Sequence, residues 1–164
     1  MENITLEKML SIERQCVNAQ DAVIIRLLIE GIEINELVYL TNDSLDLINR
    51  LLTIADHSGR TIRTIVLSKR CVELFRSASD QTIYILDNGY SPIKQSSVNL
   101  RDSDSLIKIS FQDYMANESM ITEMDSVILR AIYRRLKRLA EIFSFPELVQ
   151  LTTGKLNFKS MSYA

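Results

Sequence analysis

Five basic residues lie within positions 126–140, and no acidic residue lies among them. They are Arg130, Arg134, Arg135, Lys137 and Arg138. On a helix, residues 130, 134 and 138 stand one turn apart on one side, with residue 135 at the edge. Such a positive stripe suits contact with nucleic-acid phosphates, because each neutralised phosphate releases counterions. The alternative is an ordinary solvated helix face, since lysine and arginine are mostly exposed.

A second basic group follows the polar turn at residues 56–59. Arg60 and Arg63 lie close to this turn, where long side chains can reach the backbone of a ligand. We therefore assign both as candidate DNA-binding residues, together with the five in 126–140. The alternative is that they are exposed residues paired with acids such as Asp56 and Glu73.

The remaining residues form no known catalytic motif. His57 is the one histidine, and its neighbours Asp56 and Ser58 are adjacent in sequence. Adjacent residues on an extended chain point to opposite faces, so these three do not form a catalytic triad. The chain has no phosphate-binding glycine loop and no metal-ligand spacing, and Cys16 and Cys71 are interpreted as small core residues. We assign no catalytic residue, no metal and no cofactor.

The charge is unevenly distributed along the 164 residues, whose formal net charge is −2. Residues 1–125 carry 12 basic and 19 acidic residues, a net charge of −7, and residues 126–164 carry 7 and 2, a net charge of +5. Only the last quarter therefore has the charge of a nucleic-acid binder. No apolar stretch is long enough to span a membrane. The N-terminus lacks a basic segment followed by an apolar one, so we expect a cytoplasmic protein.

The elements that must position these residues follow from periodicity and caps, and we expect residues 1–164 to form one domain. Helices are predicted over 4–15, capped by Thr5 or Asn3, and over 21–30, ended by Gly31. Further helices are predicted over 36–40, 69–77, 124–143 and 146–150, with caps at Asn35, Ser68 and Asp125 or Ser126. Strands are predicted within 45–54 and over 61–66, 82–86 and 106–114, joined by a hairpin turn at 56–59 and a loop over 91–105. The predicted core contains Leu28, Ile29, Leu37, Leu40, Ile54, Ile65, Ile132 and Leu136.

The stretch 22–54, AVIIRLLIEGIEINELVYLTNDSLDLINRLLTI, resembles the start of the catalytic domain in tyrosine recombinases, the phage integrase family. The family pattern there is an apolar helix, then G-L-R-x-S-E-L, then L-x-x-x-D-I-D. The matching residues are Gly31, Ile34, Glu36, Leu37, Leu40 and Asp43. The likeness extends over about residues 5–90 and 122–160. It implies a mainly α domain with a small antiparallel β-sheet (α+β), a truncated form of the recombinase catalytic-domain fold.

The positions that carry chemistry in that family differ here. On the alignment, the first catalytic arginine falls on Glu33, and the hairpin lysine falls on or near Ser58. The histidine and second arginine of the H-x-x-R motif fall on Gly154 and Asn157. Tyr163 is too close to that motif to be the nucleophile. A phosphoryl-transfer site without its cations cannot stabilise the charge of the transition state.

The resemblance and the basic stripe together predict a non-catalytic, recombinase-like DNA-binding regulator. Its most concrete form is a phage or prophage transcription regulator that contacts the phosphate backbone of duplex DNA. The alternative is a module of the same fold that binds a protein partner or a second copy of itself. The net charge of −7 over residues 1–125 favours this alternative, because it opposes the approach of DNA.

Overall fold

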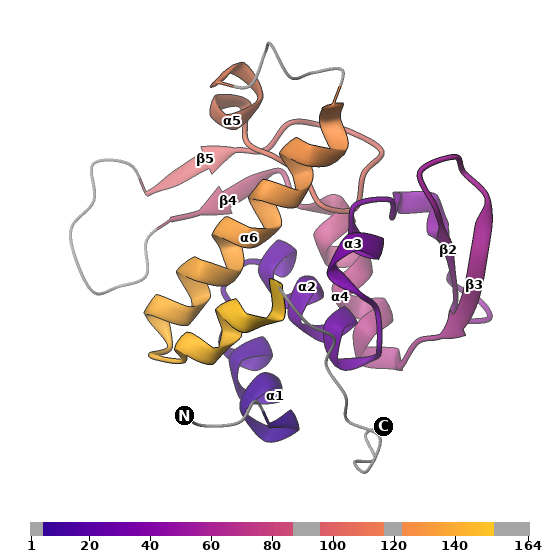
Figure 1. The fold of residues 1–164 in the computed structure, drawn as a ribbon, viewed down its shortest axis with the longest axis horizontal. Helices are drawn as coiled ribbons and strands as arrows, with labels where there is room; N and C mark the ends of the chain where they lie inside the picture. The colour runs from indigo at the N-terminus through magenta and orange to yellow at the C-terminus, as the bar shows by residue number, and fades with distance from the viewer. Residues whose placement is uncertain (1–4, 87–95, 117–122, 153–164) are drawn as a thin grey trace.

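The computed structural model describes residues 5–86, 96–116 and 123–152, and Figure 1 shows their arrangement. Helix α2 (Ala19–Ile29) lies at the centre, and α1 (Leu6–Gln15) and α4 (Lys69–Asp80) both pack against it. The apolar residues of α2 surround its axis, and Val23, Ile24 and Ile25 are completely buried. A helix that is apolar on nearly every side must be covered on nearly every side. The predicted helices 4–15, 21–30 and 69–77 are thus confirmed, with ends shifted by up to three residues.

Local capping signals set the ends of these helices. The Thr5 hydroxyl accepts a hydrogen bond from the backbone N–H of Lys8, and the Ser68 hydroxyl accepts one from Cys71. Gly31 follows α2 with a φ of +101°, the left-handed conformation that glycine adopts without strain. The short helix α3 (Ile34–Leu37) begins earlier than predicted, and its N-cap is Glu33, not Asn35.

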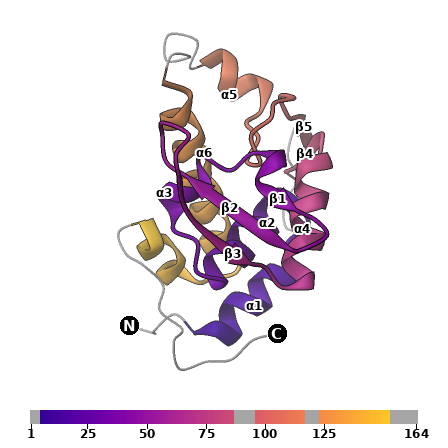
Figure 2. The same ribbon diagram turned by 90° about the vertical axis from the view of Figure 1, so that its right-hand side faces the viewer.

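Three antiparallel strands form a small sheet beside these helices, in the order β1 (Leu45–Asp46), β2 (Leu51–Ala55), β3 (Thr61–Val66). Leu52 of β2 pairs with Ile65 of β3, and the turn at 56–59 joins the two strands as predicted. A short 3₁₀ helix, Asn42–Ser44, precedes β1. Figure 2 shows this sheet in front of α2, with α6 behind the helices. Alternate residues of β2 are buried, so the sheet buries one face, and β3 is one of its two edge strands.

A second, two-stranded sheet pairs β4 (Ile83–Ile85) with β5 (Ser97–Asn99), and the helices α5 (Phe111–Ala116), α6 (Met124–Ile142) and η3 (Pro146–Thr152) follow. The prediction of a loop over 91–105 is wrong at β5, and part of that range lies outside the described residues. The predicted strand 106–114 is also wrong. Leu106, Ile107 and Ile109 are all buried, and α5 begins at Phe111. The alternating pattern fails because both sides of this segment face protein, so alternation does not mark a half-exposed strand.

The core confirms most of the sequence prediction. Seven of the eight residues assigned to it are buried: Leu28, Ile29, Leu37, Leu40, Ile54, Ile132 and Leu136. Ile65 is only partly buried, because it lies on the edge strand. The mixture of helices and small antiparallel sheets confirms the α+β class. Among the described residues, no helix is long and apolar enough to cross a membrane.

Candidate functional site

Helix α6 carries the basic stripe, and its N-cap is Glu123, not Asp125 or Ser126. Its apolar side, which includes Ile132, Leu136 and Leu139, is buried in the core. Because this side packs against the core, the opposite side of α6 faces solvent. Arg130 and Lys137 are exposed. The side chain of Arg134 is 55% exposed and that of Arg138 is 24% exposed, so the stripe runs from open solvent to a partly covered end.

Arg135 does not lie at the solvent edge of this stripe, where the sequence placed it. It is 8% exposed. Its Nη1 donates to Oε1 of Gln20 at 2.9 Å, and its Nη2 donates to the carbonyl oxygen of Lys108. Its guanidinium also lies 5.0 Å from the ring centre of Tyr84. The expectation that Arg135 lies at the edge of an exposed stripe is therefore wrong, because α2 and the segment before α5 cover that side of α6.

Arg138 reaches across to the β4 strand. Its Nη1 donates to the Tyr84 hydroxyl at 3.2 Å and its Nη2 donates to the Leu86 carbonyl at 2.8 Å. The same Nη1 lies 3.7 Å from a carboxylate oxygen of Asp21, and the Tyr84 hydroxyl donates to that carboxylate at 2.9 Å. Burial raises the pKa of Asp21, and the charges of Arg135 and Arg138 oppose this rise. Burial likewise raises the pKa of Tyr84 far above its ordinary value, so its hydroxyl keeps its proton.

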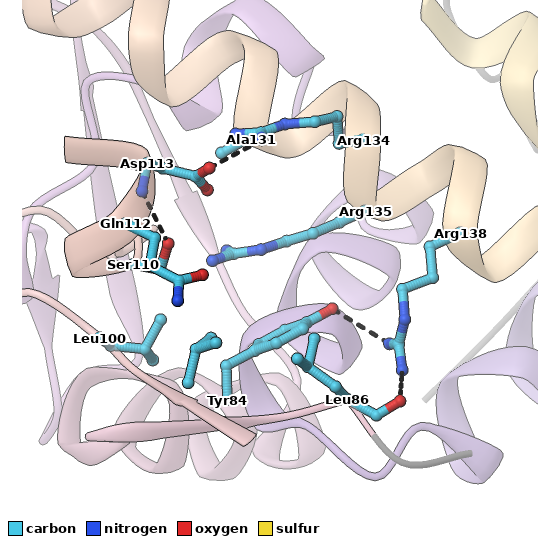
Figure 3. A pocket seen from close by; sticks show the side chains of 11 residues that line it. Tyr84, Leu86, Leu100, Ser110, Gln112, Asp113, Ala131, Arg134, Arg135 and Arg138 are labelled. Carbon is cyan, nitrogen blue, oxygen red and sulfur yellow. Dashed lines mark hydrogen bonds and ion pairs between the residues drawn. The ribbon is translucent and has the colours of Figure 1, made fainter. Parts of the chain in front are cut away.

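Arg134 forms an ion pair with Asp113 of α5, with 2.8 Å between Nη1 and Oδ1. Figure 3 shows that Arg134, Arg135 and Arg138 frame a pocket between α6, α5 and the β4–β5 sheet. Its volume is about 240 Å³. The pocket is lined by four separate segments, within 84–86, 98–100, 110–113 and 131–138, so no local motif predicts it.

The second basic group, Arg60 and Arg63, lies outside this pocket. Arg63 binds Glu36 through two bonds, 2.6 Å from Nη2 to Oε1 and 3.1 Å from Nε to Oε2, and donates to the Gly31 carbonyl. Glu36 thereby raises the pKa of Arg63. Arg60 is exposed, and its backbone N–H donates to Asp56 in the turn. The hairpin and α6 lie on different sides of the central helices, so the structure does not bring the two basic groups together (Figures 1 and 2).

The positions aligned with recombinase catalytic residues are occupied by structural contacts. Glu33 is the exposed N-cap of α3, and its backbone N–H donates to the Glu36 carboxylate at 2.9 Å. The Ser58 hydroxyl donates to Asp56 at 2.6 Å inside the turn. Gly154, Asn157 and Tyr163 lie outside the described residues. The two aligned positions that are described therefore serve a helix cap and a hairpin turn.

Several residues of the α6 pocket were not identified from the sequence. Tyr84 and Asp113 carry no local signal, because each acts through a partner in a distant segment. Gln20 and Asp21, beside the pocket, are buried polar residues in the first turn of α2, and buried polar groups require hydrogen-bond partners. Polar residues are common in the first turn of a helix, so their position in the sequence does not reveal this burial.

The thiols and the histidine add no chemistry to this site. Burial raises the pKa of Cys16 to about 12 and raises that of Cys71 further, so both thiols stay protonated at neutral pH. Cys71 is a core residue, as predicted, and Cys16 is partly buried. His57 is exposed in the turn. Within 5–86, 96–116 and 123–152, no cluster of His, Cys, Asp or Glu has the makings of a metal site.

Comparison of the sequence with known families identifies the family of this chain. Residues 3–157 match the family model described as MrpR, C-terminal catalytic domain. No curated protein matches the chain. The match supports the resemblance to recombinases seen at residues 22–54, and it covers most of the sequence. The chain therefore belongs to the family of the MrpR C-terminal catalytic domain, which is recombinase-like.

Proposed function

We propose that this domain is a non-catalytic, recombinase-like DNA-binding regulator that contacts the phosphate backbone of duplex DNA through α6. The observation that carries the proposal is the outward side of that helix. Arg130, Arg134 and Lys137 are exposed there over about two helical turns, on a helix that the core holds rigidly. Backbone phosphates supply most of the affinity of such surfaces, and the contact does not depend on base sequence.

The absence of catalysis is part of the proposal and rests on Glu33 and Ser58. A guanidinium at position 33 would clamp a phosphate, whereas the carboxylate of Glu33 repels one. Arg63, whose charge interacts with Glu33, forms its ion pair with Glu36. The family name refers to a catalytic domain, and these substitutions argue that this member retains the scaffold without the reaction.

The finer assignment is a phage or prophage transcription regulator in the cytoplasm. It is supported by the recombinase-like family and by the proposed loss of catalysis, which together suit a protein that occupies DNA without cutting it. Arg60 on the exposed hairpin turn is a second proposed phosphate contact. Arg63 is a weaker one, because Glu36 holds it through two bonds and its side chain is 37% exposed. Arg134 is more exposed, at 55%, and its ion pair with Asp113 is a single bond that a phosphate can replace.

The test of DNA binding is a mobility-shift titration at several salt concentrations. We expect Arg134→Ala and Lys137→Ala each to weaken binding to all duplexes alike, and to lower the salt slope by about one unit per lost phosphate contact. Arg138 is a less clean target, because its substitution also removes bonds to Tyr84 and Leu86.

The matched control for this experiment is Arg76→Ala, which removes an equal charge from the exposed surface of α4. It is expected to leave the affinity and the salt slope unchanged. Equal losses for all three variants would indicate a general charge effect and not a surface on α6. If the unmodified chain binds no duplex even at low salt, the DNA-binding proposal fails.

A nicked suicide duplex tests the absence of catalysis. We expect no covalent adduct between the chain and the DNA, with or without divalent cations, because Glu33 and Ser58 stand where the family has cations. Glu33→Arg alone is expected to remain inactive. A covalent adduct on denaturing gels with the unmodified chain would refute the non-catalytic assignment.

A second candidate function, protein binding or self-association, is favoured by one surface. Ile48, Ile62 and Val66 are 92%, 56% and 64% exposed on or beside the β2–β3 sheet. Exposed apolar residues grouped in this way are typical of interaction surfaces. Analytical sedimentation of the unmodified chain and of Ile62→Ser tests this candidate. Self-association is supported if the unmodified chain has a mass above that of the monomer and the variant has a lower mass.

A further inference from the structure

The pocket beside α6 contains a buried guanidinium whose charge is not matched by a direct partner. Arg135 is 8% exposed, and both its hydrogen-bond acceptors, the Gln20 amide and the Lys108 carbonyl, are uncharged. Across the parts of the chain that the structure describes, no carboxylate forms an ion pair with it within 4.0 Å. Arginine is almost never fully buried unless it is paired, because burying an uncompensated charge is costly.

The nearest counter-charge is shared. Asp21 is 1% exposed and lies 3.7 Å from Arg138, while its charge also interacts with Arg135. One carboxylate therefore serves two guanidinium groups. The third arginine of the pocket, Arg134, has its own partner in Asp113 at 2.8 Å. The pocket as a whole thus carries one positive charge more than its acids balance.

The donors are also held in place. Tyr84 lies within 5.0 Å and 5.5 Å of the guanidinium groups of Arg135 and Arg138, and its hydroxyl fixes the latter. Each guanidinium has five N–H donors in a rigid fork, and the bonds described above use two on each of these arginines. Donors fixed in advance bind an oxyanion with little loss of side-chain entropy.

The walls of the pocket are mostly apolar. Leu86, Val98, Leu100 and Ala131 line it, with Ser110 and Gln112 on one side. Figure 3 shows Arg135 extending into the middle of the pocket between Tyr84 and the Ser110–Gln112 side. The volume of about 240 Å³ is below the range of about 300–1,000 Å³ that holds drug-sized ligands. The space therefore suits one acidic group attached to a compact apolar body.

We propose that this pocket binds a small organic oxyanion, a phosphate monoester or a carboxylate, through Arg135 and Arg138. Its apolar body lies against Leu86, Val98 and Leu100. The ligand supplies the missing negative charge beside Arg135. This inference goes beyond DNA binding and does not depend on it, because a buried arginine inside a pocket is accessible to a small molecule more readily than to the backbone of a rigid duplex.

The experiment is calorimetric titration of the full chain with phenyl phosphate, inorganic phosphate and phenol. Phenyl phosphate combines a phosphate with a compact ring, inorganic phosphate lacks the ring, and phenol lacks the charge. We expect phenyl phosphate to bind at micromolar to millimolar concentration, inorganic phosphate to bind about tenfold more weakly, and phenol not to bind measurably. Thermal melting in the presence of phenyl phosphate should show a matching increase in Tm.

Two variants locate the site. Arg138→Gln is expected to weaken phenyl phosphate binding about tenfold, the usual effect of losing a charge-assisted hydrogen bond. Val98→Phe is expected to weaken it by reducing the space while leaving every charge in place. The matched control is Lys137→Gln, which removes a charge from the adjacent position of α6, outside the pocket. Melting curves of each free variant show that it is folded.

The outcomes separate this site from DNA binding. Binding of phenyl phosphate that is lost in Arg138→Gln and Val98→Phe and kept in Lys137→Gln supports the pocket, whether or not duplex DNA binds. Equal losses in Arg138→Gln and Lys137→Gln would overturn it, as would no binding of phenyl phosphate. A short duplex could raise the Tm of the unmodified chain but not that of Arg138→Gln, while phenyl phosphate leaves the Tm of both unchanged. In that case the phosphate comes from DNA and the small-molecule site is refuted.

Discussion

Replacing Glu30 with alanine is expected to lower the free energy of unfolding by about 3–5 kcal/mol, the range for removing one partner of a buried ion pair. The Glu30 side chain is 4% exposed at the end of α2. Its carboxylate accepts from Nε of Arg26 at 2.6 Å, and from the backbone N–H and the hydroxyl of Ser68, both at 2.7 Å. Removing it leaves a buried guanidinium and the N-cap of α4 without these bonds.

The control is Glu73→Ala, which removes the same chemical group from the surface of α4. Its side chain is 71% exposed and 3.9 Å from Arg70. Exposed ion pairs contribute at most about 1 kcal/mol, so a small change is expected. Chemical denaturation of both variants measures the difference. Similar losses for the two glutamates would mean that the Arg26–Glu30–Ser68 network does not connect α2 to α4 as described.

The parts of the fold predicted correctly from the sequence are those that neighbouring residues determine. Thr5 and Ser68 cap helices because the first N–H groups of a helix lack partners within it, and a hydroxyl just before them can accept a hydrogen bond from one. Gly31 and the turn at 56–59 need conformations that few residues tolerate. At these positions a single sequence is enough to identify the signal. The caps predicted at Asn35 and at Asp125 or Ser126 were wrong, because several polar residues near a helix start can each serve as the cap.

The wrong predictions over residues 91–114 depend on distant partners. Two of the three residues of β5, Ser97 and Asn99, have little strand preference, and the strand forms because it pairs with β4. Lys108 is buried because its backbone N–H donates to Gln20, eighty-eight positions earlier, and its ammonium group donates to two loop carbonyls. No pattern within 106–114 contains that information, so alternation alone favoured a strand.

In the candidate site, too, local features were predicted from the sequence and contacts between distant segments were not. Periodicity placed Arg134 correctly on the exposed side of α6, whereas Arg138 on the same stripe is partly covered by Tyr84 and Leu86. Periodicity placed Arg135 at the edge of the helix, and whether an edge faces water or protein depends on what packs there. The polar groups that receive Arg135 come from α2 and from the segment before α5. Sequence periodicity could therefore predict a basic stripe but not a pocket, since the pocket is formed by four separate segments.

Leu136→Ala is expected to lower the free energy of unfolding by about 2–5 kcal/mol, as large-to-small changes in cores do. Leu136 is completely buried at the middle of the apolar side of α6. The cost has two parts, the lost transfer of the side chain from water and the cavity that rigid neighbours cannot fill. Position 136 lies between Arg135 and Lys137 in the sequence. The result therefore also tests the rotation of α6 about its axis, which directs Arg135 inward and Lys137 outward.

Leu47→Ala is the matched control, because it makes the same chemical change at a leucine that is 51% exposed. Chemical denaturation is expected to show a loss within about 0.5 kcal/mol for this variant, as for most surface substitutions. A loss below about 0.5 kcal/mol for Leu136→Ala as well would mean that α6 is rotated from the orientation described. In that case Arg134, Lys137 and Arg138 would exchange their surroundings, and both the DNA-binding surface and the oxyanion pocket would be wrong together, because the same helix rotation places all three residues.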